Sequence, residues 1–267
     1  MSSTIEIKKL KKKDDNKEID LKGGIVIDGF PSSSGLVNAI ASECLIHSTG
    51  TDLVAFLDSP DFPPISIVNN YVPQYPLRIY VNESLKVAFF VSDINIDKVA
   101  HRDVAKAMLE WTTEKECKLI ISAQGIISSS SSHYCRSKNG NKDRYYDDNK
   151  NIDNEKSVNP TPLTPLPADI YAVTSTESAA KLLMKSRNDF THLRVGTVTG
   201  IPAILLNEGA LTNLDVIVFL VDVLRDVPDF RAAGIVSEAI SRIVPNLSCD
   251  INGLIVEAQI IENRMKK

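Results

Sequence analysis

Short apolar runs alternate with helical patterns over most of this 267-residue chain. The runs span about 4–8 residues and are rich in Val, Ile and Phe, which is typical of strands buried on both faces. Strands that alternate with helices predict an α/β fold, with a parallel sheet covered by helices on both faces. We expect these strands at residues 24–28, 53–57, 86–91, 118–122, 169–174 and 214–221.

Helical stripes separate several of these runs. Ala100, Val104, Met108 and Trp111 recur three or four residues apart, and a second stripe runs from residue 232 to 243. A last helix is expected over about residues 252–265. Residues 78–81 and those from 85 onward flank a short turn, which predicts one antiparallel hairpin within the mainly parallel sheet.

Two segments lack this patterning. Residues 1–20 mix lysines with acidic residues and have no apolar periodicity, so we expect a disordered tail. Residues 128–167 open with five serines and close with four prolines, and we expect a disordered insertion there that is dispensable for folding. Residues 21–267 are expected to form one domain that the insertion interrupts, because apolar runs of the same kind resume after it.

Composition and charge exclude several classes of protein. Thirty basic against 34 acidic residues give a net charge of -4, so no basic surplus is available for a nucleic-acid partner. No apolar run approaches the roughly 20 residues of a spanning helix, and no secretory signal follows the N-terminal lysines. Four cysteines without C-x-x-C spacing indicate reduced thiols, a cytoplasmic location and no metal site.

The turn after the first of these buried runs is the sharpest local pattern. Ser32, Ser33, Ser34 and Gly35 lie between a strand and a helix, where backbone N–H groups and the positive helix end favour an anion. The Lys-Ser/Thr pair and the glycine spacing of known phosphate loops are missing. An anion contact at these four residues is therefore the weaker hypothesis, and a tight turn that packs closely is the favoured one.

Acidic residues near strand ends are the other candidates for chemistry. Asp28, Asp93 and Asp222 stand where open α/β sheets place their ligands, and paired carboxylates could do acid–base work or hold a metal. Carboxylates are also common strand terminators and helix caps, which is the interpretation we favour. Glu208 could be catalytic, but a helix-end residue that holds a loop is the more ordinary role. We therefore assign no catalytic residue.

Histidines and cysteines add no firm site. Cys44 and His47 are three residues apart on an expected helix, but no second pair completes a metal site. None of the four histidines has a recognisable catalytic partner; they are His47, His101, His133 and His192. Two helix starts are expected, one with Pro202 at its first position and one with Pro228 and Asp229 in its first turn.

Several motifs together resemble the archaeal proteasome-assembly-chaperone family. They recur in family order from about residue 24 to 260, and the combination is more specific than any single piece. The motifs are Gly29-Phe30-Pro31, Gly35-Leu36-Val37, Asp61-Phe62-Pro63-Pro64, Thr199-Gly200-Ile201, Leu205-Leu206-Asn207-Glu208 and Pro228-Asp229-Phe230-Arg231-Ala232-Ala233.

The resemblance implies a single three-layer α/β/α domain, similar to nucleoside phosphorylases in fold but without their catalytic residues. It also implies homo-oligomers, no cofactor and, for some relatives, a role in assembly of the proteasome core. Apolar residues such as Ile260 beside Ile261 exceed what one helical stripe needs, which favours an oligomer interface. The ending Asn263-Arg264-Met265-Lys266-Lys267 lacks a hydrophobic-Tyr-any-residue tail, so docking through such a tail is not expected.

The function expected from the resemblance is a non-enzymatic assembly factor or chaperone, with proteasome subunits or another oligomeric complex as partners. The alternative is a small-molecule enzyme of phosphorylase-like or ATP-grasp-like type, acting on a nucleotide or amide near Asp28 and Asp93. A scaffold that merely oligomerises is a third hypothesis.

Overall fold

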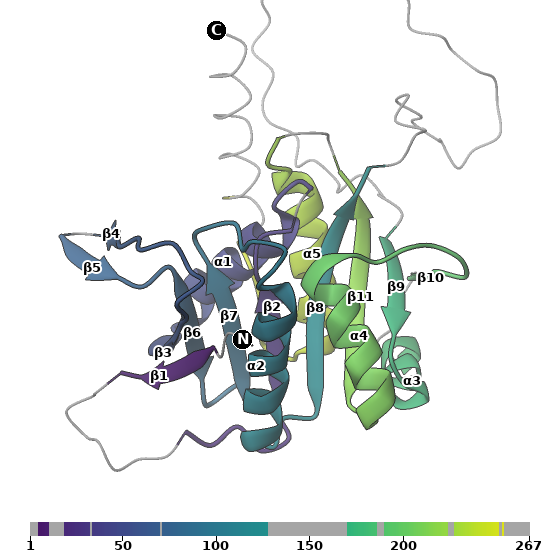
Figure 1. Cartoon of the computed structure of the whole chain (residues 1–267). Helices are drawn as coiled ribbons and strands as arrows, with labels where there is room; N and C mark the ends of the chain where they lie inside the picture. The colour runs from purple at the N-terminus through teal and green to yellow at the C-terminus, as the bar shows by residue number, and fades with distance from the viewer. Residues whose placement is uncertain are drawn as a thin grey trace, which may run out of the picture.

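The computed structural model describes residues 5–10, 19–32, 34–69, 71–127, 170–185, 190–223, 227–250 and Gly253. The insertion expected at 128–167 and, apart from Gly253, the helix expected at 252–265 lie outside these residues. The described residues form three layers, in which a central sheet separates two groups of helices (Figure 1). The predicted α/β/α class is confirmed.

The central sheet is mixed and has its parallel strands in the middle (Figure 1). In spatial order the strands are β1 (Glu6–Lys9), β3 (Asp52–Asp58), β6 (Leu77–Asn82), β7 (Val87–Ser92), β2 (Ile25–Gly29), β8 (Leu119–Ile126), β11 (Asp215–Asp222), β9 (Ile170–Thr174) and β10 (Thr191–His192). Strands β7, β2, β8 and β11 run parallel, and β6 and β7 form the predicted antiparallel hairpin. β1, β3 and β9 add further antiparallel pairings, so the sheet contains more than the one hairpin expected.

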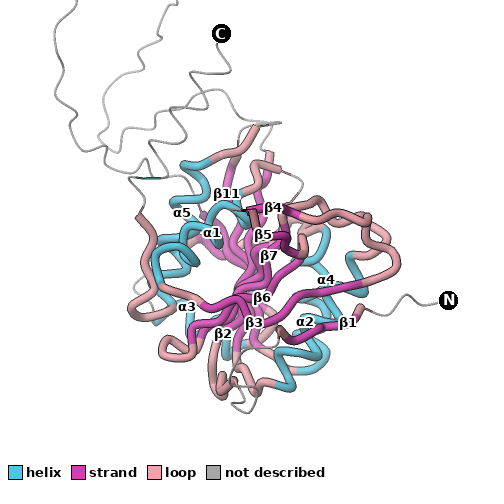
Figure 2. The backbone as a smooth tube through the Cα atoms, turned by 90° about the vertical axis from the view of Figure 1, so that its left-hand side faces the viewer, coloured by secondary structure: helices cyan, strands magenta, loops and turns pink. Residues whose placement is uncertain are grey.

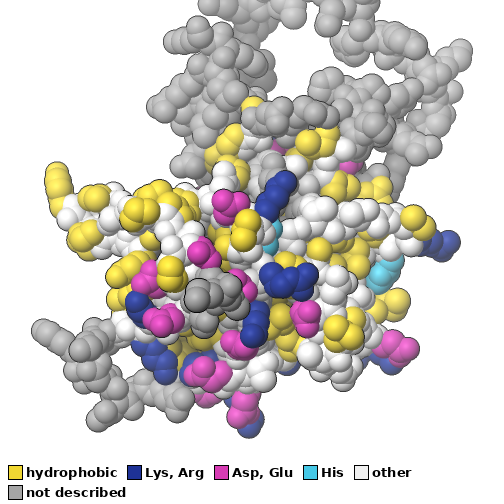
Figure 3. Space-filling model, viewed as in Figure 1, with side chains coloured by type: hydrophobic (Ala, Val, Ile, Leu, Met, Phe, Trp, Pro, Cys, Tyr) yellow, Lys and Arg dark blue, Asp and Glu magenta, His cyan; other side chains and the backbone are white. Residues whose placement is uncertain are grey.

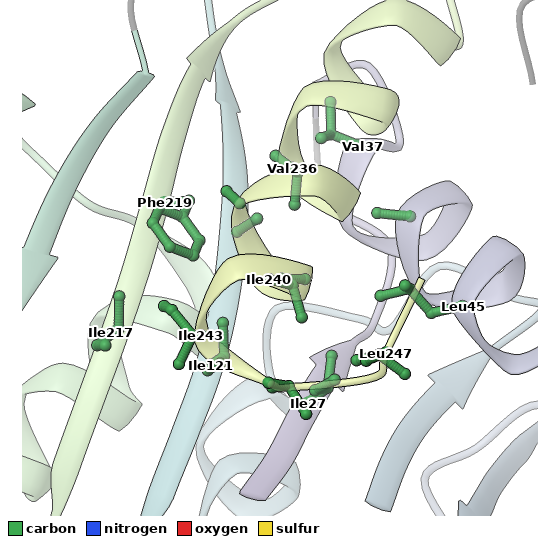
Figure 4. Packing of buried hydrophobic residues seen from close by; sticks show 14 of the residues in the cluster. Ile27, Val37, Leu45, Ile121, Ile217, Phe219, Val236, Ile240, Ile243 and Leu247 are labelled. Carbon is green, nitrogen blue, oxygen red and sulfur yellow. The ribbon is translucent and has the colours of Figure 1, made fainter. Parts of the chain in front are cut away.

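Helices cover both faces of the sheet (Figure 2). On one face lie α1 (Val37–Thr49), α3 (Glu177–Lys185) and α5 (Phe230–Ile243), whereas α2 (His101–Glu114) and α4 (Gly200–Thr212) lie on the other. Figure 4 shows the first face, where Val236 and Ile240 of α5 pack over the central strands.

Successive residues of the central strands point into opposite layers, which explains their unbroken apolar runs. In β8, Ile120 belongs to the core beneath α2 and α4, and Ile121 belongs to the core beneath α1 and α5. Both side chains are fully buried. Because each residue of such a strand is covered by one helical layer or the other, polar alternation is absent from the sequence.

The N-terminal segment corrects one expectation. Glu6–Lys9 forms strand β1, which pairs antiparallel with β3 and places Ile7 opposite Leu57. Ile7 packs against the core, and Lys8 Nζ lies 2.6 Å from Asp58 Oδ2. The disordered tail predicted for residues 1–20 is therefore wrong for this stretch, because two apolar side chains, Ile5 and Ile7, suffice to dock an edge strand.

Two helix starts differ in detail from expectation. Helix α4 begins at Gly200, so Pro202 is its third residue rather than its first; the first turn still tolerates it because its missing N–H needs no partner there. Helix α5 begins after Asp229, whose carboxylate caps the helix by accepting a hydrogen bond from the Ala232 N–H at 3.0 Å.

The cysteines correct a second expectation. Cys44 in α1 and Cys249 beyond α5 form a disulfide, with their Cα atoms 5.5 Å apart, although the sequence indicated reduced thiols. The two residues are 205 positions apart, so their proximity depends on how α1 and α5 pack. Cys117 is a buried free thiol, and burial raises its pKa to about 11. Cys135 lies outside the described residues.

A small hairpin, which the sequence analysis did not predict, stands apart from the sheet. Strands β4 (Ile67–Asn69) and β5 (Val72–Gln74) pair only with each other in the described structure, in the connection between β3 and β6. Figure 1 shows this hairpin projecting to the left of the domain. Among the described residues, no helix combines the length and the apolar character that a bilayer crossing requires.

Candidate functional site

The carboxyl ends of the parallel strands are where an open α/β sheet places ligands. Asp28, the penultimate residue of β2, lies there but is only 1% exposed. Its Oδ2 accepts a 2.7 Å hydrogen bond from the Ser122 hydroxyl, and its Oδ1 accepts one of 3.0 Å from the Phe30 N–H. Burial raises the pKa of Asp28 to about 6, against the lowering effect of these hydrogen bonds. The carboxyl group is thus committed to internal contacts.

Asn38 in α1 fixes the turn that follows β2. Its side chain donates to the Phe30 carbonyl at 3.3 Å and accepts from the Ala123 N–H at 3.0 Å, which ties the turn to β8. Gly125 lets the turn approach closely, because a Cβ there would lie 2.4 Å from the Ser34 carbonyl oxygen. The turn is therefore pressed onto the end of β8.

The serine-rich turn has mainly structural contacts. The Ser32 hydroxyl donates to the Ser34 carbonyl at 3.3 Å, and the Gly35 carbonyl accepts from the Asp229 N–H at 2.8 Å. Gly35 has a φ of +69°, and a Cβ there would also meet Val223 at 2.9 Å, so glycine is required. Ser33 lies outside the described residues. These contacts fit a tight turn, and the anion contact stays a prediction.

Asp93, the second strand-end carboxylate, has a separate partner. It receives Arg78 in a two-pronged ion pair, with Nη1–Oδ2 at 2.6 Å and Nη2–Oδ1 at 3.0 Å. Arg78 is itself buried in β6 and also donates to the Tyr75 carbonyl at 3.2 Å. Such paired geometry is the strong form of an ion pair. Asp28 and Asp93 therefore each hold neighbouring segments in place and do not form one acidic pair.

The other sequence candidates are dispersed. Asp222 is an exposed residue at the end of β11. Glu208 lies toward the opposite end of the sheet, because its neighbour Gly209 abuts Val216 near the start of that strand. Cys44 is in the disulfide and offers no thiolate to a metal, and His47 lies 3.1 Å from Glu43.

The remaining histidines do not gather either. His101 begins α2, and its Nε2 lies 3.0 Å from the Ile96 carbonyl oxygen. His192 is exposed on β10, and His133 lies outside the described residues. Within the described part of the chain, no three of the His, Cys, Asp and Glu side chains cluster as a metal site would need.

A groove of about 610 Å³ lies between the connection after β3 and the connection before α2. Its apolar wall includes Phe62, Leu77, Ile94 and Ile96. Charged and polar groups join that wall, with Asp61, Asn95, Asp97 and Lys98 also lining the groove, together with Pro63 and Ala100. Among the described residues, no side chain pairs with the carboxylate of Asp61 or of Asp97. The mixed lining suits a peptide segment or side chains better than a phosphate.

Two hydrogen bonds between Gln124 and Thr199 attach the start of α4 to the end of β8. The Gln124 side chain of β8 donates to the Thr199 hydroxyl at 2.8 Å and accepts from the Thr199 N–H at 3.1 Å. Because Thr199 is the N-cap residue of α4, this pair sets where the helix begins.

Sequence reasoning missed most of these residues. Asn38, Ser122 and Gln124 contact partners 75 to 94 positions away, and Arg78 contacts Asp93 across the β6–β7 hairpin, so no short spacing identifies them. The groove was marked only indirectly, since Asp61, Phe62 and Pro63 belong to one of the quoted motifs.

The described residues thus form a three-layer α/β domain with a mixed sheet, in which two strand-end carboxylates, Asp28 and Asp93, are bonded to other side chains of the same chain. The PAC2 family model matches residues 26–267, and the chain belongs to the PAC2 family.

Relatives match nearly the whole length of the chain. An uncharacterized protein of Methanocaldococcus jannaschii is 24% identical over 250 residues, covering 94% of this chain and 87% of its own. PbaA of Pyrococcus furiosus, described as an archaeal homolog of proteasome-assembly chaperone, has a TM-score of 0.73 at 22% identity, covering 98% and 94% of the two chains. PbaB of the same organism, described as an archaeal proteasome activator, has a TM-score of 0.69 at 19% identity, covering 98% of each chain.

Proposed function

We propose that this protein is a non-enzymatic assembly factor or chaperone for the proteasome core or a related oligomeric complex. It acts in the cytoplasm as a homo-oligomer and recognises protein surfaces. The observation that carries the proposal is the match of the PAC2 family model to residues 26–267.

Structural neighbours support this role. PbaA is described as a homolog of a proteasome-assembly chaperone and PbaB as a proteasome activator, and both share the fold over nearly the whole chain. A fold alone does not carry a function. The groove, with its apolar wall, and the projecting hairpin nevertheless offer the kind of surface that binds other proteins.

The enzymatic alternative finds less support in the strand-end residues. A catalytic centre needs an acid or base that converges with a nucleophile in an accessible cavity. Asp28 is buried against Ser122, and Asp93 is paired with Arg78, so the proposed pair of carboxylates has two separate structural duties. An assembly factor has no need for an accessible carboxylate at Asp28 or Asp93.

Affinity capture distinguishes the two functions. The tagged full chain is used as bait in native lysate, and retained proteins and metabolites are both identified by mass spectrometry against a bait-free control. We expect proteasome core subunits to be enriched. Retention of a metabolite without any enriched protein would support the enzyme and contradict the proposal.

A further inference from the structure

The projecting hairpin has a composition unlike that of the rest of the chain. From Phe62 to Leu77 there is no Asp, Glu, Lys or Arg, although 24% of the chain is charged. A stretch of this length would carry about four charges at the average frequency. We call residues 64–76 the arm; Asn70 within it is not described. Loops in contact with water are usually charged or polar, so the missing charges set this segment apart.

The arm nevertheless exposes its apolar side chains. Tyr71 is 98% exposed and Val68 is 67% exposed, and Ile65, Val72 and Tyr75 are each about half exposed. Figure 3 shows hydrophobic side chains along the whole projection at the left of the molecule. Their exposed area amounts to several hundred Å², close to the apolar share of a standard interface of about 800 Å² per partner.

In the described part of the chain, the arm is anchored at its base. Tyr75 stacks on Phe56 of β3, with ring centroids 3.6 Å apart, and its carbonyl accepts a hydrogen bond from Arg78. Toward the tip, the strands β4 and β5 pair with no other described strand. An isolated two-stranded hairpin is marginally stable in water, so the arm needs a second surface to cover it. Its unpaired strand edges add to that need.

The groove supplies such a surface at the base of the same arm. Phe62 and Pro63 lead into the arm, Leu77 follows it, and all three line the groove. Six extended residues between base and tip span about 20 Å. Two arms that lie side by side in opposite directions would therefore place each tip, with Tyr71, over the groove of the other copy. One two-fold axis satisfies both contacts at once, as in an isologous dimer.

We propose that the arm is an exchange element between two copies of this chain, in which the uncharged arm of each copy covers the apolar wall of the other copy's groove. The partner is a second copy because arm and groove adjoin on one face, so a single symmetric contact buries both. The inference rests on the homo-oligomer proposed above but not on the proteasome partner.

A charge placed on the arm tests the exchange. Val68→Lys puts an ammonium group in the proposed contact, whereas Val195→Lys makes the same change at a valine that is 90% exposed elsewhere. Light scattering after size exclusion should give a multiple of 29.3 kDa for the wild type and for Val195→Lys. For Val68→Lys we expect at least a tenfold higher concentration for half-dissociation, with an unchanged melting temperature.

Cross-linking between differently labelled copies tests the geometry. In a Cys135→Ser background, Tyr71→Cys protein is mixed with Asn95→Cys protein, since Asn95 is an exposed residue of the groove. Oxidation of the mixture should give a covalent dimer, and neither protein alone should give it with comparable yield.

Each failure has a distinct meaning. A monomeric wild type at micromolar concentration would overturn both the homo-oligomer and the exchange. An oligomer that survives Val68→Lys and gives no cross-link would overturn the exchange alone. Loss of proteasome-subunit binding in Val68→Lys, with the oligomer intact, would assign the arm to that partner and likewise overturn the exchange.

Discussion

Asp28 is a carboxyl group that the fold keeps away from water. Its two oxygens accept hydrogen bonds from Ser122 and from the Phe30 backbone, yet burial outweighs them and raises its pKa to about 6. In the unfolded chain the pKa returns to its ordinary value of 3.8. Between these two pKa values the unfolded state loses a proton that the folded state retains. Ionisation of Asp28 therefore lowers stability as the pH rises from about 4 to 6.

Replacing Asp28 with asparagine should remove this cost. The amide keeps an oxygen for the Phe30 N–H and offers an N–H to the Ser122 oxygen, so the local contacts are retained. We expect Asp28→Asn to match the wild type near pH 4 and to exceed it by about 2–3 kcal/mol above pH 7. Urea unfolding of both proteins at several pH values measures the difference.

The Asp28→Ala variant serves as a control, because it leaves the Ser122 hydroxyl and the Phe30 N–H without their acceptor. It should be less stable than Asp28→Asn at every pH. A difference between Asp28→Asn and the wild type that stays constant from pH 4 to 8 would show that burial does not govern this carboxyl.

Single residues show where sequence reasoning stopped. Asp28 was identified as a strand-end carboxylate, but its hydrogen-bond donor Ser122 is 94 positions away. Asp93 was identified in the same way, while its partner Arg78 carries no sign of a buried role in its own neighbourhood. The sequence pattern around each residue placed both carboxylates at strand ends. Their partners, Ser122 and Arg78, were known only from the structure.

Helix α1 and the segment after α5 are joined by the Cys44–Cys249 disulfide. Helices α1 and α5 also pack together over the sheet, with Val37 and Leu45 of α1 near Val236 and Ile240 of α5 (Figure 4). A link between residues so distant in the chain restricts the unfolded state strongly. The disulfide therefore reinforces a contact that the core already makes.

Loss of the disulfide should destabilise the domain by about 2–5 kcal/mol, with a melting temperature roughly 5–15 °C lower. Reductant should produce this effect in the wild type. The Cys44→Ser/Cys249→Ser protein should melt at the lower temperature with or without reductant, which makes it the control. If thiol titration shows that the reductant has broken the bond and the melting temperature of the wild type does not change, the disulfide does not stabilise the domain.

Helices and strands were predictable where their own residues show a clear apolar pattern. The central strands have unbroken apolar runs, and α2 and α5 have clear stripes, so their types and approximate positions were correct. Strand β1 was missed because two apolar residues among lysines resemble a solvated tail. The arm was missed because its valines and tyrosines are exposed in the described structure, so they do not follow the pattern of a strand buried in the central sheet.

At the scale of the whole molecule, the layers followed from the order of elements. Alternating strands and helices allow few other arrangements, which is why the three-layer class was correct. The extent of antiparallel pairing was not predictable, because β3 and β9 pair with strands that do not adjoin them in the chain, namely β6 and β11. The groove arises where the connection after β3 meets the connection before α2, so its composition could not be assembled from any one segment.

The proposed function is to promote assembly of an oligomeric complex, for which the proteasome core is the first candidate. The direct measurement mixes purified, unassembled α and β subunits of the core from the same organism, with and without the full chain. Native mass spectrometry then follows the assembly intermediates and the finished particle over time. We predict a complex between the chain and the subunits, together with faster formation of the particle. Identical assembly kinetics, with no complex at tens of micromolar protein, would contradict the account.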